Sequence, residues 1–395
     1  MHMSFDKFLG RKTSSAETRY IVYAFAHDFL TRSISLPSSP LSQLTFTPRS
    51  YDFWFHTLPF ATVFVLSESF MLVLSEEQVR SLINVEELIT ALAQAHIQYS
   101  TGKAVMPVRL VVPLPQIQGR ITSMPGYLTE DKALGMKVVT YFQNNPEQDL
   151  PAILAMVMLF SASTGKMIAV MDGSYITAIR TACASAVATG ALANPETPIL
   201  GILGAGVQAR AHIQALCRVR ELSKIKLYSP SGISAANVKK ELERVAGVPI
   251  EIAKSVEETV RNSDLVVTAT TAQQPVLRFE WLKPGAHVNA VGSHRPDSRE
   301  IDGATVAHSK VVVDSRDAIM AECGDILLAI KENSITENHI HAEIGEVLAG
   351  VKPGRSSASE VTLYKSVGIA IQDVATAQLV YHKALKLKVG TNVEI

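Results

Sequence analysis

The chain has 395 residues, of which 47% are hydrophobic and 19% are charged, and its formal net charge is +0. This composition is typical of a folded globular protein, and the length is sufficient for two domains. The charge balance gives no support to nucleic acid or an acidic membrane surface, so we predict neither as the main partner. The cysteines Cys183, Cys217 and Cys323 lie far apart and form no CxxC pair, which indicates a reducing compartment such as the cytoplasm.

Residues 1–70 are predicted to be a poorly ordered extension. The segment Arg32–Ser50 is rich in Ser and Pro and shows no periodicity. The apolar run Phe55–Leu74 is interrupted by Pro59 and Glu68, and it lies too far into the chain for a signal peptide. We therefore predict no membrane span here.

The next region has the pattern of an α+β domain. Ser75 and Gln78 fit a capping box at the start of a helix, and helical spacing of apolar residues continues to Ile97. The stretches after it predict a mostly antiparallel sheet, with a hairpin in the last stretch. These strand-like stretches are Pro107–Pro115, Gly119–Leu128, Leu134–Phe142 and Ala152–Gly173. A run of small residues over Ser174–Ala193 then predicts a long helix.

From Pro198 onward, strand-like and helix-like stretches alternate, which predicts a parallel doubly wound sheet. The strand-like stretches begin at Pro198, Lys224, Asp264, Ala286 and Ser309. We predict that the final stretches, His339–Gly354 and Val361–Leu387, are helical and pack back on the first domain.

A glycine-rich turn follows the first of these strands. Gly204, Gly206 and Ala209 form the pattern GxGxxA between an apolar strand and a helix, which is the context that a dinucleotide-binding turn requires. Gly204 permits the tight turn, Gly206 lets the backbone approach a pyrophosphate, and Ala209 stays small for packing. The helix start supplies free N–H groups for the phosphates. We therefore predict a bound dinucleotide.

The tip of the second alternating strand indicates which dinucleotide is preferred. NAD-binding proteins place a carboxylate there, on the ribose hydroxyls. This chain has Ser229 and Ser231 instead, so a 2′-phosphate would not be repelled, although Pro230 stands where a phosphate-binding arginine is expected. We favour NADP over NAD as the cofactor.

Three long cations stand in otherwise apolar elements. Arg109, Lys137 and Arg180 each have few polar neighbours in sequence, and a buried cation is costly unless it is paired. Each one alone is also explained by an ion pair or by a side chain that reaches solvent. Together, beside a dinucleotide fold, they predict an anionic substrate, because arginine binds a carboxylate bidentately and a desolvated lysine holds a carboxylate or moves a proton.

Motifs along residues 71–387 resemble those of the ornithine cyclodeaminase/mu-crystallin family, in the family's order and spacing. They include "PVRLVV", "GMKVVTYF", "ITAIRTACASA", "GILGAGVQA", "KPGAHVNAVGSHRPDSREID", "ECGDI" and "TLYKSVGIAIQD". The resemblance implies a Rossmann dinucleotide-binding domain over 191–330. It also implies an α+β substrate and dimerisation domain over 71–190 and 331–395, and hence a homodimer.

The resemblance also implies the roles of individual residues. Arg109, Lys137 and Arg180 would bind the substrate carboxylate, with Lys137 near the reacting nitrogen. The cofactor would be contacted by residues of the glycine-rich turn, of the strand tips and of the C-terminal motif. These are Gly204, Ala205, Gly206, Val207, Gln208, Ser229, Ser231, Thr270, Val291 and Ser366, together with Arg180.

His294 bears on the type of reaction. Cyclodeaminases of this family carry an aspartate two residues after the "VG" of the motif that contains "NAVGSHRP", and here that position is His294. A histidine does not hold an ammonium as a carboxylate does, but it can act as an acid or base near neutral pH. We therefore predict an NAD(P)H-dependent reductase of cyclic imine 2-carboxylates, similar to ketimine reductases, that gives pipecolate or proline.

Three alternatives remain open at this stage. They are ornithine or lysine cyclodeamination, an alanine dehydrogenase-like reaction, and a non-catalytic binding protein similar to the lens crystallins of the family.

Other charged residues are predicted to be structural. We predict no metal site, because His339, His341 and Glu343 are typical of a solvated surface. Glu322 and Asp325 are predicted either to face the cleft or to cap a helix or pair with an arginine, and we do not predict them to be catalytic. Asp314 is predicted to be structural. The run Arg295–Glu300 is interpreted as a charged loop that holds its own shape.

Overall fold

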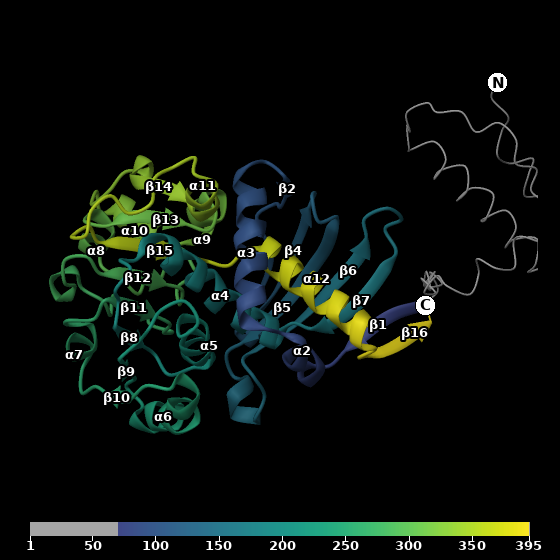
Figure 1. Ribbon diagram of the computed structural model, residues 1–395, viewed down its shortest axis with the longest axis horizontal. Coiled ribbons are helices and arrows are strands. Elements are labelled where there is room, and N and C mark those ends of the chain that lie inside the picture. Colours follow the sequence, from purple (N-terminus) through teal and green to yellow (C-terminus); the bar gives the residue numbers. More distant parts are fainter. Residues whose placement is uncertain (1–69, 395) are drawn as a thin grey trace, which may run out of the picture. The chain divides into compact units, whose positions relative to one another are not determined.

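The computed structural model describes residues 70–394 (Figure 1). The extension predicted for residues 1–70 lies outside this range, except for Phe70, which begins the first strand. Within the described range, no helix combines the length and the apolar character needed to cross a membrane.

The first sheet has eight strands in the order β16-β1-β7-β6-β5-β4-β2, and β3 pairs with β4 beside β2. All neighbouring strands are antiparallel except β1 and β7, which confirms the mostly antiparallel sheet predicted from sequence. The strands are β1 (Phe70–Leu74), β2 (Ala104–Val105), β3 (Leu110–Leu114), β4 (Gly119–Leu128), β5 (Ala133–Phe142), β6 (Ile153–Ser161), β7 (Met167–Asp172) and β16 (Thr391–Glu394).

Four helices belong with this sheet: α2 (Glu76–Leu82), α3 (Val85–Ser100), α4 (Ser174–Leu192) and α12 (Ala370–Leu387). The capping box of Ser75 and Gln78 at the start of α2 is confirmed. The helix predicted to run on to Ile97 is divided at Asn84, whose side chain caps α3. Helix α12 lies across β4, β5 and β6, as Figure 1 shows, so the C-terminal helix packs back on the first sheet as predicted.

The second sheet also has eight strands, in the order β10-β9-β8-β11-β12-β15-β13-β14. Every neighbouring pair is parallel, which confirms the doubly wound prediction. The strands are β8 (Ile199–Leu203), β9 (Lys224–Tyr228), β10 (Ile250–Ile252), β11 (Leu265–Thr268), β12 (His287–Ala290), β13 (Lys310–Val313), β14 (Ile340–Glu343) and β15 (Thr362–Lys365). Their order reverses between β8 and β11, the place where such sheets bind ligands.

The helices associated with the second sheet are mostly short. They are α5 (Val207–Leu216), α6 (Gly232–Ala246), α7 (Val256–Val260), α8 (Gly303–Ala307), α9 (Arg316–Glu322), α10 (Gly324–Lys331) and α11 (Ile344–Leu348).

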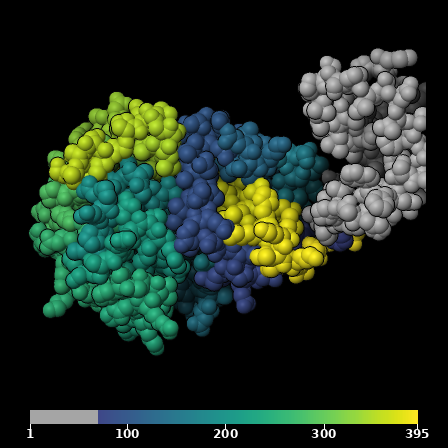
Figure 2. Space-filling view, viewed as in Figure 1, coloured from purple at the N-terminus to yellow at the C-terminus, as the bar shows by residue number. Residues whose placement is uncertain are grey.

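The prediction of a wholly helical C-terminal region is wrong. Ile340–Glu343 and Thr362–Lys365 are strands of the parallel sheet, and β15 lies between β12 and β13. All four residues of β15 are buried, so the strand shows no alternation of apolar and polar residues. The predicted domain boundary at residue 330 therefore separates β14 and β15 from the sheet to which they belong. In Figure 2 the yellow-green surface around residues 340–360 is separate from the yellow surface of α12.

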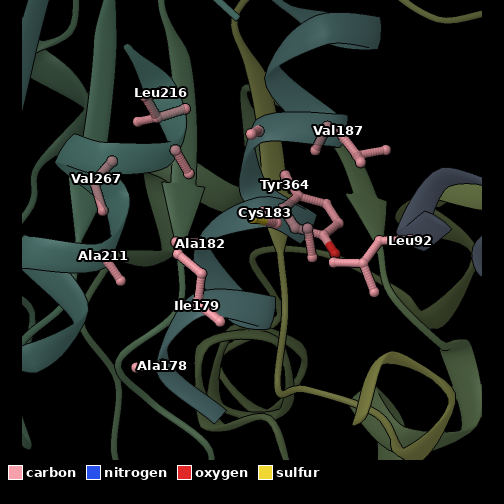
Figure 3. Close-up of a cluster of buried hydrophobic side chains, with 14 of the residues drawn as sticks. Leu92, Ala178, Ile179, Ala182, Cys183, Val187, Ala211, Leu216, Val267 and Tyr364 are labelled. Atoms are coloured by element: carbon pink, nitrogen blue, oxygen red, sulfur yellow. The ribbon is translucent and has the colours of Figure 1, made fainter. Parts of the chain in front are cut away.

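One continuous core joins the two sheets. Figure 3 shows Leu92 of α3 and Cys183 of α4 near Tyr364 of β15, with Leu216 of α5 and Val267 of β11 in the same cluster. The small residues of α4 are nearly all buried, which allows α5 to pack closely against it. Helix α4 thus connects the first sheet to the second.

Candidate active site

The turn between β8 and α5 has the shape that a dinucleotide phosphate needs. Gly204 has φ +111°, and a Cβ at this position would overlap the carbonyl oxygen of Ala269, so only glycine fits. Gly206 is the N-cap of α5, and a Cβ there would meet open space. Among the described residues no side chain caps this end, so N–H groups of the first turn remain available to an anion. Ala205 and Val207 lie on the same turn.

Gln208 supplies a second feature that fits a dinucleotide. Its side-chain Oε1 is buried and has no hydrogen-bond partner among the described residues. A buried acceptor without a donor is unfavourable. A ribose hydroxyl or an amide N–H of a bound ligand would satisfy it, so the residues of this turn fit the predicted cofactor.

The tip of β9 carries hydroxyl groups and no acid. Ser229 is partly buried directly after the strand. Ser231 is exposed and caps α6, because its Oγ accepts a hydrogen bond from the backbone N–H of Ser234 at 3.3 Å. No carboxylate therefore stands in the sequence from Tyr228 to Ser231 to repel a 2′-phosphate.

Glu300 holds together the ends of β11 and β12. Its Oε1 accepts the backbone N–H of Thr270 at 2.6 Å, and its Oε2 accepts the backbone N–H of Gly292 at 2.7 Å and the Thr268 hydroxyl at 2.8 Å. Two residues that we predict to contact the cofactor, Thr270 and Val291, lie on these strand ends. Burial raises the pKa of the Glu300 carboxyl.

The placement of Glu300 corrects one interpretation. Arg295 and Asp297 are exposed and pair at 2.6 Å, as expected of a charged loop. Glu300, however, is 0% exposed and belongs to a buried network instead. Asp325 accepts the backbone N–H of Glu300 at 2.7 Å and pairs with the buried Lys365 at 2.9 Å. Asp325 thus has a lysine as its partner.

Asp314 organises the loop after β15. Its Oδ2 accepts the Ser366 hydroxyl at 2.7 Å and the backbone N–H groups of Val367 at 3.0 Å and Gly368 at 2.7 Å. These bonds support the structural role predicted for Asp314. Ser366 is buried and directs its hydroxyl proton to Asp314, so only its remaining lone pair is left for a cofactor.

The structure brings Lys137 and Arg180 together on one carboxylate. Lys137 on β5 places Nζ 2.9 Å from Oδ1 and 2.8 Å from Oδ2 of Asp373, in the first turn of α12. Arg180 on α4 donates from Nε to the same Oδ1 at 3.0 Å and from Nη1 to the side-chain oxygen of Gln372. Lys137 is 1% exposed and Arg180 is 4% exposed. Gly368 has φ +79°, a backbone conformation that favours glycine, and a Cβ there would meet the Arg180 guanidinium.

Burial and the neighbouring arginines lower the pKa of Lys137 to about 7. Desolvation is the largest cause, repulsion by Arg180 follows, and Asp373 opposes both. A lysine with this pKa exchanges its proton near neutral pH, which is the property required of a general acid or base.

Arg109 lies at the same loop but faces another carboxylate. Its Nη2 donates to the carbonyl oxygens of Val367 at 2.8 Å and Gly368 at 2.6 Å, and its Nε lies 2.9 Å from Oε2 of Glu322. Glu322 thus pairs with an arginine, which is one of the roles predicted for it. A small, partly open pocket is lined by Arg109, Glu322 and Gly368 among others.

His294 contacts an arginine rather than an acid. Its Nε2 lies 2.6 Å from Nη2 of Arg120, and its Nδ1 lies 3.2 Å from the carbonyl oxygen of Gly292. Since an arginine only donates, Nε2 accepts and Nδ1 carries the proton. Burial, followed by repulsion from Arg120 and Arg109, lowers the His294 pKa to about 3. The imidazole is therefore neutral at neutral pH, and the acid role considered for it there is not supported.

Sequence reasoning missed three residues of this site. Asp373 lies in the first turn of a helix, where an acid is ordinarily explained by the helix dipole. Gln372 precedes it and carries no distinctive pattern. Arg120 stands next to Gly119 at the start of β4, and no motif in the sequence marked it. Its inward direction follows from the burial pattern of β4, in which Thr122 and Met124, on the same face, are buried.

The histidines near β14 have separate partners. His339 Nε2 contacts the carbonyl oxygen of Val306 at 2.8 Å, and His341 Nε2 contacts that of Pro353 at 2.9 Å. Within residues 70–394, no group of three or more His, Cys, Asp or Glu residues is arranged to hold a metal ion.

Comparison with known proteins points to one family. The model of the ornithine cyclodeaminase/mu-crystallin family matches residues 70–388. A mouse protein named ketimine reductase mu-crystallin is 39% identical over 280 residues, which cover 71% of this chain and 85% of the mouse chain.

Two solved structures share the fold over most of the chain. One is the Δ1-pyrroline-2-carboxylate reductase of Thermococcus litoralis in complex with NADH and L-proline, with 43% identity and a TM-score of 0.80. It covers 82% of this chain and 100% of its own. The other is an archaeal alanine dehydrogenase dimer with bound NAD, with 34% identity, a TM-score of 0.78, and coverage of 82% and 99%.

Proposed function

The chain belongs to the ornithine cyclodeaminase/mu-crystallin family, and we propose that it is an NAD(P)H-dependent reductase of cyclic imine 2-carboxylates. The substrates are pyrroline-2-carboxylate and piperideine-2-carboxylate, and the products are proline and pipecolate. The chain is thus an oxidoreductase that acts on a C–N bond. The observation that carries this function is the buried pair of Lys137 and Arg180 on Asp373.

The cationic residues have distinct roles in this reaction. Arg180 and Arg109 bind the substrate carboxylate, and each exchanges part of its contact with Asp373 or Glu322 for the substrate. Lys137, with its pKa of about 7, donates the proton that the imine nitrogen needs. A cofactor bound at the glycine-rich turn supplies the hydride that adds to the imine carbon. The C=N bond becomes a C–N single bond, and the product is a secondary amine.

The turn, the strand tips and the loop after β15 hold the cofactor in this proposal. The backbone of Gly204, Ala205, Gly206 and Val207 faces the phosphates. Ser229 and Ser231 lie at the ribose, and Thr270, Val291 and Ser366 lie toward the nicotinamide. Two related structures contain NADH or NAD. NADP is our preference here, because no acid stands at the tip of β9.

The neutral His294 supports reduction of a preformed imine. An imidazole with a pKa of about 3 provides no negative charge to hold the second ammonium of ornithine or lysine. The retained cations Arg109, Lys137 and Arg180 argue against a purely structural, non-catalytic protein.

A homodimer is also part of the proposal. The outer face of the first sheet exposes large apolar side chains, and such patches mark interaction surfaces. Those that the strand register places on this face are Leu110, Val112, Ile121, Leu154 and Met156. The related alanine dehydrogenase is a dimer. We further propose the cytoplasm as the compartment, since Cys183, Cys217 and Cys323 are free thiols.

The test is a set of turnover measurements with purified protein. Each imine is mixed with NADPH or NADH, and both cofactor oxidation and amino-acid formation are followed. We expect turnover of at least one imine, lost in the Arg180→Ala variant. Ammonia release from ornithine without net cofactor consumption would show cyclodeamination instead, and an unaffected Arg180→Ala variant would count against the site.

A further inference from the structure

Arg120 shares one face of the first sheet with Lys137. Strands β4 and β5 pair so that Met124 lies opposite Lys137 and Arg120 lies opposite Tyr141. Because side chains alternate along a strand, Arg120 and Met124 point to the same side of the sheet, the side that α12 covers at Lys137. Four residues of strand separate the two positions, about 13 Å along the sheet. Arg120 is therefore farther from Asp373 along this face than Lys137 is.

The contacts of Arg120 place its guanidinium at the end of β12. Nη2 lies 2.6 Å from His294 Nε2, and the guanidinium carbon lies 5.0 Å from the centre of the Tyr141 ring. Repulsion by Arg109 is among the causes that lower the Arg120 pKa, after burial and Arg295. The charges of Arg120 and Arg109 thus lie close enough to interact.

Arg120 differs from Arg109, Lys137 and Arg180 in what balances its charge. Arg109 is paired with Glu322, and Lys137 and Arg180 share Asp373. Arg120 forms no ion pair within 4.0 Å with any of residues 70–394. Its direct partner, His294, is neutral and accepts a hydrogen bond without supplying negative charge. Glu322 also acts on Arg120, from beyond ion-pair distance, but its carboxylate is paired with Arg109. A half-buried cation without an ion pair of its own attracts a negative group and repels a positive one.

We propose that Arg120, held by His294, selects substrates by charge at the end of the molecule that lies away from the 2-carboxylate. It favours an acidic or hydrogen-bond-accepting group there and rejects an ammonium. This inference rests on the proposed function, in which the 2-carboxylate binds at Arg109, Lys137 and Arg180. It gives the chain a specificity-determining residue beyond those three cations.

The experiment compares three amino acids that share a backbone and differ in side-chain charge. L-glutamate, L-glutamine and L-ornithine are measured as inhibitors of imine reduction and as ligands by calorimetry. We expect glutamate to bind the wild-type protein at least about 10-fold more tightly than ornithine, with glutamine between them. In Arg120→Gln this ratio falls to about 3-fold or less, while glutamine affinity changes by less than about 3-fold.

Further variants separate selection from folding. Arg120→Lys keeps the positive charge and should keep most of the ratio. His294→Asp places a carboxylate beside Arg120 and should lower the ratio as Arg120→Gln does. Arg278→Gln is the matched control, because Arg278 is exposed and outside the site, with a side-chain exposure of 61%. Thermal unfolding of each variant confirms that it is folded.

A wild-type protein that shows no preference for glutamate, or binds none of the three ligands, would overturn the proposal. So would an Arg120→Gln variant that keeps the wild-type ratio. The proposed function fails separately, if neither imine is reduced by the wild-type protein. Calorimetry needs no turnover, so it tests Arg120 even in that case.

Discussion

Lys137 and Asp373 show how one buried carboxylate sets the chemistry of its neighbours. Asp373 keeps two cations in a place with almost no solvent. Burial, and after it repulsion by Arg180, lowers the Lys137 pKa to about 7, while Asp373 opposes both. When Lys137 is protonated, Lys137 and Arg180 carry two positive charges and Asp373 carries one negative charge. The remaining positive charge suits a substrate carboxylate.

The low pKa of Lys137 predicts a pH dependence. Imine reduction needs protonated Lys137, so kcat/KM is fully present below pH about 7 and falls as pH rises through that value. In Lys137→Arg the guanidinium keeps its charge but does not release its proton, so kcat/KM is low at every pH and this alkaline decrease disappears, while any titration of the free imine remains. Initial rates over a range of pH for both proteins provide the measurement. An unchanged decrease in Lys137→Arg would contradict the role of Lys137.

Glu300 provides a second prediction for a single residue. Glu300→Gln replaces one acceptor oxygen with an amide that faces backbone N–H donors, so the ends of β11 and β12 are held less well. We expect the KM for the cofactor to rise by about 10-fold and the imine KM to change less, since one unsatisfied buried group costs about 1–3 kcal/mol.

Steady-state kinetics with each reactant varied in turn tests this prediction. Glu332→Gln is the matched control, because Glu332 pairs with Arg299 and its side chain is 46% exposed. Equal changes in both KM values would indicate general loosening of the site instead.

At the scale of one element, the glycine-rich turn depends on its backbone conformation, because its backbone rather than its side chains binds the cofactor. Gly204→Ala puts a Cβ at φ +111° against the Ala269 carbonyl. We expect the free energy of unfolding to fall by about 1–3 kcal/mol and cofactor binding to weaken. Urea unfolding with and without NADPH measures both effects. Gly190→Ala in α4 is the control, because a Cβ there meets open space; equal losses in the two variants would contradict this account.

The tip of β9 predicts how cofactor choice can be changed. Ser229→Asp adds a negative charge where a 2′-phosphate would lie, so kcat/KM for NADPH should fall by about 10-fold or more while that for NADH changes little. Kinetics with each cofactor give the ratio. A wild-type protein that uses NADH alone would show that our preference for NADP is wrong.

Which strands and helices could be predicted from the sequence depended on whether their signals were local. The strands β4 to β7 and the turn after β8 were predictable, because alternation and glycine spacing are local signals. Strand β15 was not, because its four residues are buried on both faces and its Lys365 depends on Asp325 from α10. Arg109, Lys137 and Arg180 were found as cations in apolar surroundings, but their acids come from remote helices. Asp373 lies 236 residues from Lys137 in the chain.

At the scale of the whole molecule, the outer face of the first sheet exposes apolar side chains that a single chain does not cover. On β6 the inward residues Ala155, Val157 and Leu159 are buried, whereas Leu154 and Met156 are exposed. A monomer would leave this apolar surface in water.

The homodimer can be tested by light scattering coupled to size exclusion. We expect the wild-type protein to have twice the chain mass and a Leu154→Glu/Met156→Glu variant to be a monomer, because two buried carboxylates per protomer oppose association. Ile233→Glu is the control, since Ile233 is 78% exposed on α6. A dimeric double variant would show that another surface forms the contact.

The central claim is that the chain transfers hydride to the carbon of a cyclic imine. The most direct measurement uses NADPH or NADH that carries deuterium at the reactive position of the nicotinamide, with each imine in turn, and mass spectrometry of the product. We predict proline or pipecolate with one deuterium at C2, in an amount equal to the cofactor oxidised. An unlabelled product, or no cofactor oxidation with either imine, would contradict the account.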